Sequence, residues 1–172
     1  MPFDLSFDDL MLKPGAYRSI YFADMPVEER RSFLISFMET LPDECVDMAT
    51  FGGYQDNDHG TKLSTINRVG GEDYLRELST SDHLCGMVAC IGGWCHLLWP
   101  AASTFHDPVL NPDRLGDGPQ LAGMNFLGLT YRQSDALFFG YDANEDFDYW
   151  GDVDAMQATH EEVITALKRA LL

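Results

Sequence analysis

Positive charge is scarce in this sequence. Its 172 residues hold 11 lysines and arginines against 28 aspartates and glutamates, which gives a formal net charge of −17. A chain this negative is repelled by the phosphates of nucleic acids and by anionic membrane surfaces. We therefore expect no direct binding to nucleic acids or membranes, and we expect its partners to be basic protein surfaces.

Several other features are missing. Four cysteines are too few for the dense disulfide framework of a small secreted domain. Residues 1–5 carry an aspartate where a secretory signal would carry basic residues, so we expect a cytoplasmic protein. The sequence also contains no glycine-rich phosphate loop, no nucleophile elbow and no His-Glu-x-x-His motif.

Charged side chains are absent between Asp82 and Asp107, and this stretch is long enough to cross a bilayer. Its glycines and its proline, together with flanking aspartates instead of basic residues, argue against a membrane span. We interpret residues 85–99 as a helix buried on all sides, because apolar residues surround it almost completely.

The rest of the chain is typical of one folded domain. Eleven Phe, seven Tyr and three Trp supply a large core, so we expect a single domain over residues 1–172. The spacing of apolar residues and the capping signals predict a mainly α fold, with a few short strands allowed. The predicted helices span residues 26–41, 72–78, 121–127 and 131–139, and a last helix is opened by the capping box at 159–162. Residues 1–25 are predicted to be a less regular N-terminal extension, with a short strand at 19–22.

The segment from Cys85 to Trp94 reads Cys-Gly-Met-Val-Ala-Cys-Ile-Gly-Gly-Trp. It resembles the Cys-Gly-Thr-x-x-Cys-Ile-Ala-Gly-Trp/His signature of a family of small uncharacterised proteins from bacteria and their phages. Residues 46–51, 127–129 and 137–138 match further segments of that family. The resemblance implies a compact helical domain of bacterial or phage origin, and it implies no activity and no catalytic residues.

The cysteines suggest two kinds of chemistry. Cys85 is predicted to lie at a helix N-terminus, where the dipole lowers a thiol's pKa, so a thiol hydrolase built on Cys85 is one alternative. A metal-binding structural domain that uses Cys85, Cys90, Cys95 and His96 is a further alternative. Cysteines five apart on a helix point about 140° away from each other, which disfavours shared coordination of zinc. We therefore expect no metal or other cofactor.

The acidic stretch 142–154 matches the start of a calcium-binding EF-hand loop, but Phe147 and Val153 occupy positions that need glycine and glutamate. Either its aromatic residues pack on the core while its acids are solvated, or the acids bind a basic partner. The candidate partner-binding residues are Asp142, Glu145, Asp146, Asp148, Asp152 and Asp154.

Charge is concentrated at both ends of the chain. Residues 1–50 carry ten acids and four bases, and residues 141–172 carry eight acids and two bases. If the two ends share a face, their carboxylates would resemble a phosphate track that occupies a nucleic-acid-binding groove on another protein, as in counter-defence inhibitors of phages. The favoured prediction is a non-enzymatic acidic interaction protein, and acidity that serves solubility alone is the competing interpretation.

Overall fold

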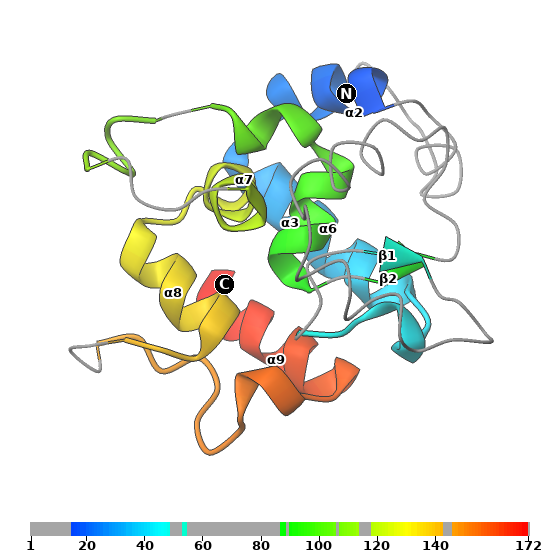
Figure 1. Cartoon of the computed structure of the whole chain (residues 1–172), viewed down its shortest axis with the longest axis vertical. Helices are drawn as coiled ribbons and strands as arrows, with labels where there is room; N and C mark the ends of the chain where they lie inside the picture. The colour runs from blue at the N-terminus through cyan, green and yellow to red at the C-terminus, as the bar shows by residue number, and fades with distance from the viewer. Residues whose placement is uncertain are drawn as a thin grey trace.

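The computed structural model describes residues 15–48, 53–54, 87–88, 90–105, 107–113, 118–142 and 146–171. Helices dominate these residues and confirm the predicted mainly α class (Figure 1). They are α2 (Gly15–Ala23), α3 (Val27–Thr40), η1 (Asp43–Cys45), α6 (Ile91–Leu98), η2 (Pro100–Ser103), α7 (Gly118–Leu127), α8 (Tyr131–Phe139), η3 (Ala155–Gln157) and α9 (His160–Leu171). The short strands β1 (Gly53–Tyr54) and β2 (Met87–Val88) pair antiparallel. No helix in these ranges combines the length and apolar composition needed to cross a membrane.

Helix α6 lies at the centre, and all eight of its residues are buried, as predicted. The predicted start at residue 85 is wrong, because Met87 and Val88 are extended in β2 and the helix begins at Ile91. Cys90 is its N-cap, and the Cys90 sulfur accepts a hydrogen bond from the Gly93 amide at 3.3 Å. The thiol thus takes the place of the usual hydroxyl or carboxylate cap.

Helices α6 and α7 pack closely because Gly92 has no side chain. A Cβ at Gly92 would lie 2.9 Å from the Pro119 carbonyl oxygen in the first turn of α7. Helix α7 begins at Gly118, about one turn before the predicted start at residue 121. The α6–α7 pair therefore depends on backbone-to-backbone proximity at this one position.

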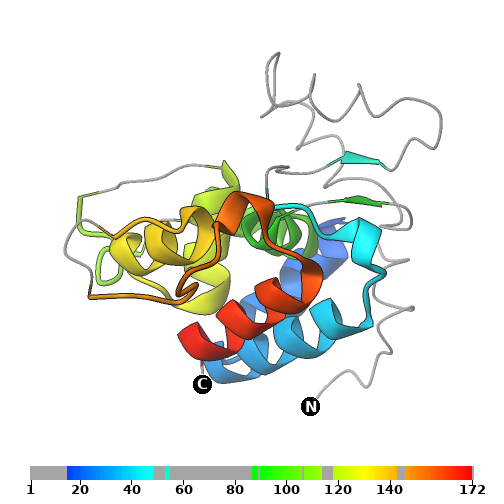
Figure 2. The same cartoon turned by 90° about the horizontal axis from the view of Figure 1, so that it is seen from below.

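Helices α3 and α9 lie side by side along one face of the molecule (Figure 2). Lys168 on α9 forms an ion pair with Glu39 on α3 at 2.6 Å. At the other end of α9, His160 contacts Asp43 through Nδ1 and the Met38 carbonyl through Nε2, each at 2.8 Å. The two acid-rich ends of the chain are therefore neighbours in the fold, as far as their described residues are concerned.

The predicted strand at residues 19–22 is wrong, because this segment belongs to helix α2. Its buried face consists of Arg18 and Phe22, which are one helical turn apart and both fully buried. Because an arginine occupies a core-facing position, the apolar periodicity of this helix is interrupted, and the sequence pattern does not predict a helix here. Residues 15–23 are thus more regular than expected, and residues 1–14 lie outside the described ranges, as does the helix predicted at 72–78.

The predicted capping boxes are confirmed. Thr130 and Gln133 exchange side-chain and backbone hydrogen bonds at the start of α8, and Gly140 ends that helix with φ of 68°. Thr159 and Glu162 make the same exchange at α9. These contacts are local in sequence, which is why the residue pattern predicts them.

Three arginines donate to the carbonyl-rich C-terminal ends of helices. Arg18 donates to the Leu97 carbonyl at the end of α6 at 3.0 Å. Arg30 donates to the carbonyls of Asn125 and Phe126 in α7 and to those of Phe22 and Met25 at the end of α2. Arg31 donates to the Leu127 carbonyl at 2.8 Å. The last carbonyls of a helix have no amide partner within it, and a cation there also complements the helix dipole.

Candidate functional site

The acidic loop, which we define as residues 142–154 between α8 and α9, is organised around Asp142. The Asp142 side chain is only 3% exposed. Its Oδ2 atom accepts hydrogen bonds from the amides of Asp146 at 2.7 Å and Phe147 at 2.9 Å. Asp142 therefore shapes the loop from inside, and it is not part of the surface that a partner would contact.

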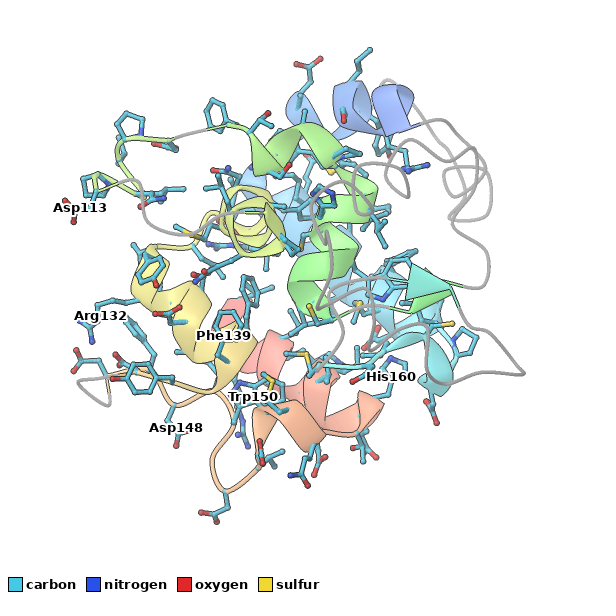
Figure 3. All side chains as sticks on the ribbon, viewed as in Figure 1. Asp113, Arg132, Phe139, Asp148, Trp150 and His160 are labelled. Atoms are coloured by element: carbon cyan, nitrogen blue, oxygen red, sulfur yellow. The ribbon has the colours of Figure 1, made fainter. Side chains whose placement is uncertain are left out.

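Arg132 on α8 fastens this loop to the helix (Figure 3). Its Nη2 atom lies 2.8 Å from Asp142 Oδ1 and 2.9 Å from Asp146 Oδ2, and its guanidinium stacks over the Phe147 ring. The hydrogen bonds that Arg132 donates to the two carboxylates, that to Asp142 first, raise the pKa of Arg132 above its ordinary value. Sequence analysis did not identify Arg132, because its contact with Asp142, ten residues further along the chain, produces no periodic pattern in the sequence.

The aromatic residues of the acidic loop pack on the core, as one of the two interpretations predicted. Tyr149 and Trp150 are buried, and Phe147 packs against the core cluster. Trp150 donates its indole N–H to the carbonyls of Ala136 and Leu137 at 3.0 and 3.1 Å, which uses the last turn of α8. The loop is therefore anchored at both ends, and its outward side chains have a fixed backbone beneath them.

The remaining acids of the loop face outward. Asp148, Asp152 and Asp154 are exposed, and Asp148 points away from the helices in Figure 3. Asp148 accepts the Gly151 amide at 2.6 Å, and Asp154 accepts the Met156 amide at the start of η3, so two of the three carboxylates have defined orientations. Asp146 is exposed but pairs with Arg132, and Glu145 lies outside the described residues.

Exposed apolar side chains lie close in sequence to these carboxylates. Phe139 and Tyr141 flank Gly140 immediately before the loop, and Met156 follows Asp154. A Cβ built at Gly140 would lie 3.0 Å from Ala155 Cβ, so the ends of these two segments are adjacent. We define the loop face as Asp148, Asp152, Asp154, Phe139, Tyr141 and Met156.

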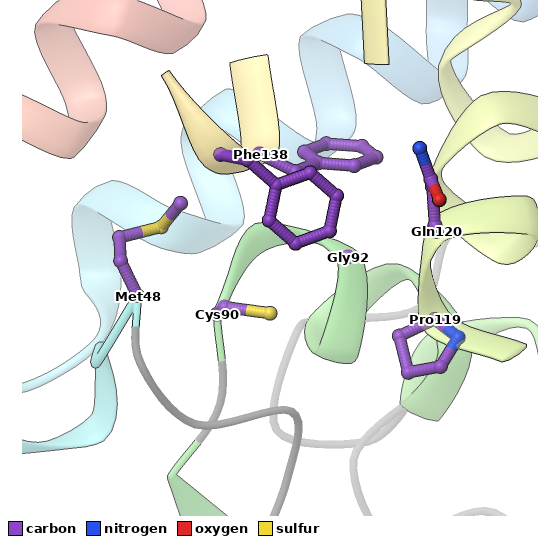
Figure 4. Close-up of a pocket in the computed structure, with 7 residues that line it drawn as sticks. Met48, Cys90, Gly92, Pro119, Gln120 and Phe138 are labelled. Carbon is purple, nitrogen blue, oxygen red and sulfur yellow. The ribbon is translucent and has the colours of Figure 1, made fainter. Parts of the chain in front are cut away.

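The cysteines that the structure describes are packing residues. Cys45, Cys90 and Cys95 are all buried. Burial raises the pKa of Cys90 to about 11 and raises the pKa of Cys95 well above its ordinary value. The hollow between Cys90, Met48, Pro119 and Phe138 has a volume of about 10 Å³, which leaves room for one water molecule at most (Figure 4).

The structure describes only some of the residues of the two cysteine-based alternatives. A thiol hydrolase also needs a histidine within hydrogen-bond reach of its cysteine, and the sequence offers His59, His83, His106 and His160. Cys85 lies outside the described ranges, as do His59, His83 and His106. Both ring nitrogens of His160 are engaged with Asp43 and Met38. Among the described residues, no three His, Cys, Asp or Glu side chains form a group that could hold a metal ion.

The chain matches no protein-family model, no curated protein and no solved structure. The resemblance of residues 85–94 to a bacterial and phage family remains a prediction. The function of this protein is therefore inferred from its own geometry and charge.

We expect Cys90 and Cys95 to resist alkylation in the native protein. Because burial raises both pKa values, the thiols stay protonated at about pH 8, and a protonated thiol is a poor nucleophile. Iodoacetamide should modify them at least about tenfold more slowly in native protein than in guanidinium-unfolded protein. Peptide mapping by mass spectrometry measures each site separately. Prompt modification of native Cys90 or Cys95 would contradict this, whereas prompt modification of Cys85 alone would favour the thiol hydrolase.

Proposed function

We propose that this protein is an acidic, non-enzymatic interaction protein of the cytoplasm that binds a basic surface of a partner protein through the loop face. By the resemblance of its central segment, its origin is bacterial or phage. Its carboxylates would occupy a groove of the partner that otherwise holds nucleic acid, which would make it an inhibitor of a nucleic-acid-binding protein.

The main support for this proposal is that the described basic residues already have partners within the fold. Arg18 and Arg30 are buried on helix ends, and Arg132 is held by two carboxylates of the acidic loop. Lys168 pairs with Glu39, and Arg169 donates to the Tyr149 carbonyl. The exposed acids Asp148, Asp152 and Asp154 have no such counterions among the described residues, so the loop face presents unbalanced negative charge.

The loop face also has the composition of a binding surface. Interfaces typically combine an apolar or aromatic centre with a polar rim, and most of the binding energy comes from a few central residues. Phe139, Tyr141 and Met156 supply apolar area beside the carboxylates. A surface that served solubility alone would not need a fixed backbone and exposed aromatic side chains together.

The proposal predicts that removing charge from the loop face weakens partner binding. The variant D148N/D152N/D154N keeps an oxygen acceptor at each position, so the loop's hydrogen bonds are preserved while three negative charges are lost. The partner is first captured from a bacterial lysate with the native protein and identified by mass spectrometry. At low salt, it should bind this variant roughly tenfold more weakly than it binds the native protein. Binding by the native protein should fall as salt rises, and added DNA or RNA should compete for the partner.

The matched control is E29Q/D113N/E161Q, which removes three exposed charges elsewhere and should bind as the native protein does. Asp142 is left unchanged in both variants, because its substitution would disturb the loop itself. Equal retention of the partner by both variants would refute the loop face as the binding site. Failure of nucleic acid to compete would refute mimicry while leaving partner binding intact.

A further inference from the structure

An apolar groove lies between α2 and the turn η2, on elements that contribute nothing to the loop face. Its volume is about 510 Å³, and its walls include Ser19, Ile20, Ala23, Trp99, Thr104 and Phe105. Ile20 is 66% exposed and Phe105 is 53% exposed, although both are large hydrophobic side chains. Figure 1 shows α2 at the end of the molecule away from α8 and α9.

The walls of this groove are held in place by hydrogen bonds. Ser19 Oγ accepts the Ala101 amide at 3.2 Å, which joins α2 to η2. The buried Asn125 amide donates to the carbonyls of Ala102 and Phe105, each at 2.7 Å, which fixes the segment that carries Phe105. A preformed groove is a better binding site than a mobile one, because less conformational entropy is lost when an occupant binds.

Trp99 forms part of the inner wall of the groove. Its side chain lines the groove, and Arg30 stacks over its ring at 4.9 Å. Its buried indole N–H has no acceptor among the described residues. Trp99 therefore belongs to both the groove and the core, so its indole N–H can report by NMR on an occupant of the groove.

Charge selects among the possible occupants. Asp24 follows Ala23 directly and is exposed, and Asp107 lies two residues beyond Phe105. Arg18 of the same helix is fully buried and donates to the Leu97 carbonyl. With a net charge of −17, a second copy of the chain, a nucleic acid and an anionic membrane are all repelled. The complementary occupant is apolar on one side and cationic on the other.

We propose that this groove binds the apolar face of a basic amphipathic helix from a partner protein. Aliphatic side chains of that helix cover Ile20 and Phe105, and its lysines or arginines face Asp24 and Asp107, which follow Ala23 and Phe105 closely in the chain. Such helices dock through apolar residues spaced three and four apart, and a groove of this size accommodates a few of them.

The test uses model peptides of about 14 residues, or roughly four helical turns. One contains only leucine and lysine in amphipathic order, and its counterpart replaces every lysine with glutamate. Binding is followed by the NMR signal of the Trp99 indole N–H in the full-length protein. We expect the leucine–lysine peptide to shift this signal in a saturable manner and the leucine–glutamate peptide to leave it unchanged.

Two variants separate the groove from general attraction by charge. I20S/F105S removes apolar area from the groove and should weaken binding of the leucine–lysine peptide at least about tenfold. V109S removes an exposed hydrophobic side chain outside the groove, 85% exposed, and should bind normally. The loop variant D148N/D152N/D154N should also bind normally, so the groove and the loop face are tested independently. An unshifted Trp99 signal, equal binding of both peptides, or undiminished binding to I20S/F105S would overturn the proposal.

Discussion

Replacing Arg30 with alanine is expected to lower the free energy of unfolding by about 3 kcal/mol or more. Arg30 is 7% exposed, and its guanidinium donates to four carbonyls at the ends of α2 and α7. Its removal takes this donor away from the carbonyls of Met25, Asn125 and Phe126 and opens a cavity beside Trp99. Urea denaturation followed by far-ultraviolet circular dichroism measures the loss.

Two further variants test whether the geometry of the guanidinium is what matters. Arg30→Lys keeps the charge, but an ammonium group cannot span two helix ends as a planar fork does, so most of the stability should remain lost. Arg169→Ala is the control, since Arg169 is exposed and makes a single hydrogen bond to the Tyr149 carbonyl at 3.3 Å. It should cost no more than about 1 kcal/mol. If Arg30→Ala were as mild as Arg169→Ala, the role assigned to Arg30 would be wrong.

The substitution Gly92→Ala is expected to destabilise the protein by about 2 kcal/mol, although alanine is the better helix former. The new Cβ would lie 2.9 Å from the Pro119 oxygen and 3.3 Å from its carbonyl carbon. Both atoms are backbone, so α6 and α7 must separate to relieve the clash. Thermal and urea denaturation of the variant measure the net effect of propensity and clash.

Gly123→Ala provides the matched comparison. The three atoms nearest to a Cβ at Gly123 all belong to the ring of Phe138, which is a side chain and can be shortened. We therefore expect Phe138→Leu to relieve part of the Gly123→Ala clash in a double-mutant cycle. A neutral or stabilising Gly92→Ala would show that α6 and α7 can shift apart freely, against the close packing described above.

The structure also changes how charge on this protein is understood. Composition treats all 28 acids and 11 bases alike. In the fold, Asp142 is an internal brace of the acidic loop, whereas Asp148, Asp152 and Asp154 face outward. A neutralisation experiment that included Asp142 would confuse loss of loop structure with loss of binding, and the variants proposed here avoid this.

Elements whose signals are local were predictable. The helix Val27–Thr40 ends just before Pro42, and the helix Tyr131–Phe139 lies between a capping box and Gly140. In each, the deciding residues lie within a few positions of one another, so their hydrogen bonds form in any fold that includes the helix.

Elements whose stability depends on distant partners were mispredicted or missed. Helix α2 buries Arg18, and the Leu97 carbonyl, 79 residues away, accepts a hydrogen bond from that side chain in the core. The start of α6 moved from residue 85 to Ile91 because Met87 and Val88 pair with β1. The residues close to Arg18 or to Met87 in the sequence do not indicate the distant partner that each has in the fold.

By itself the sequence determined the helical class, most helix boundaries and the excess of negative charge, since these follow from short-range periodicity, capping and composition. Only the tertiary structure decided where that charge is presented. It buries Arg18 and Arg30 against helix ends and turns Asp142 inward, because backbone carbonyls and amides that lack partners within their own segments must find them across the fold. The exposed carboxylates that remain, and the apolar groove beside α2, are consequences of that long-range pairing.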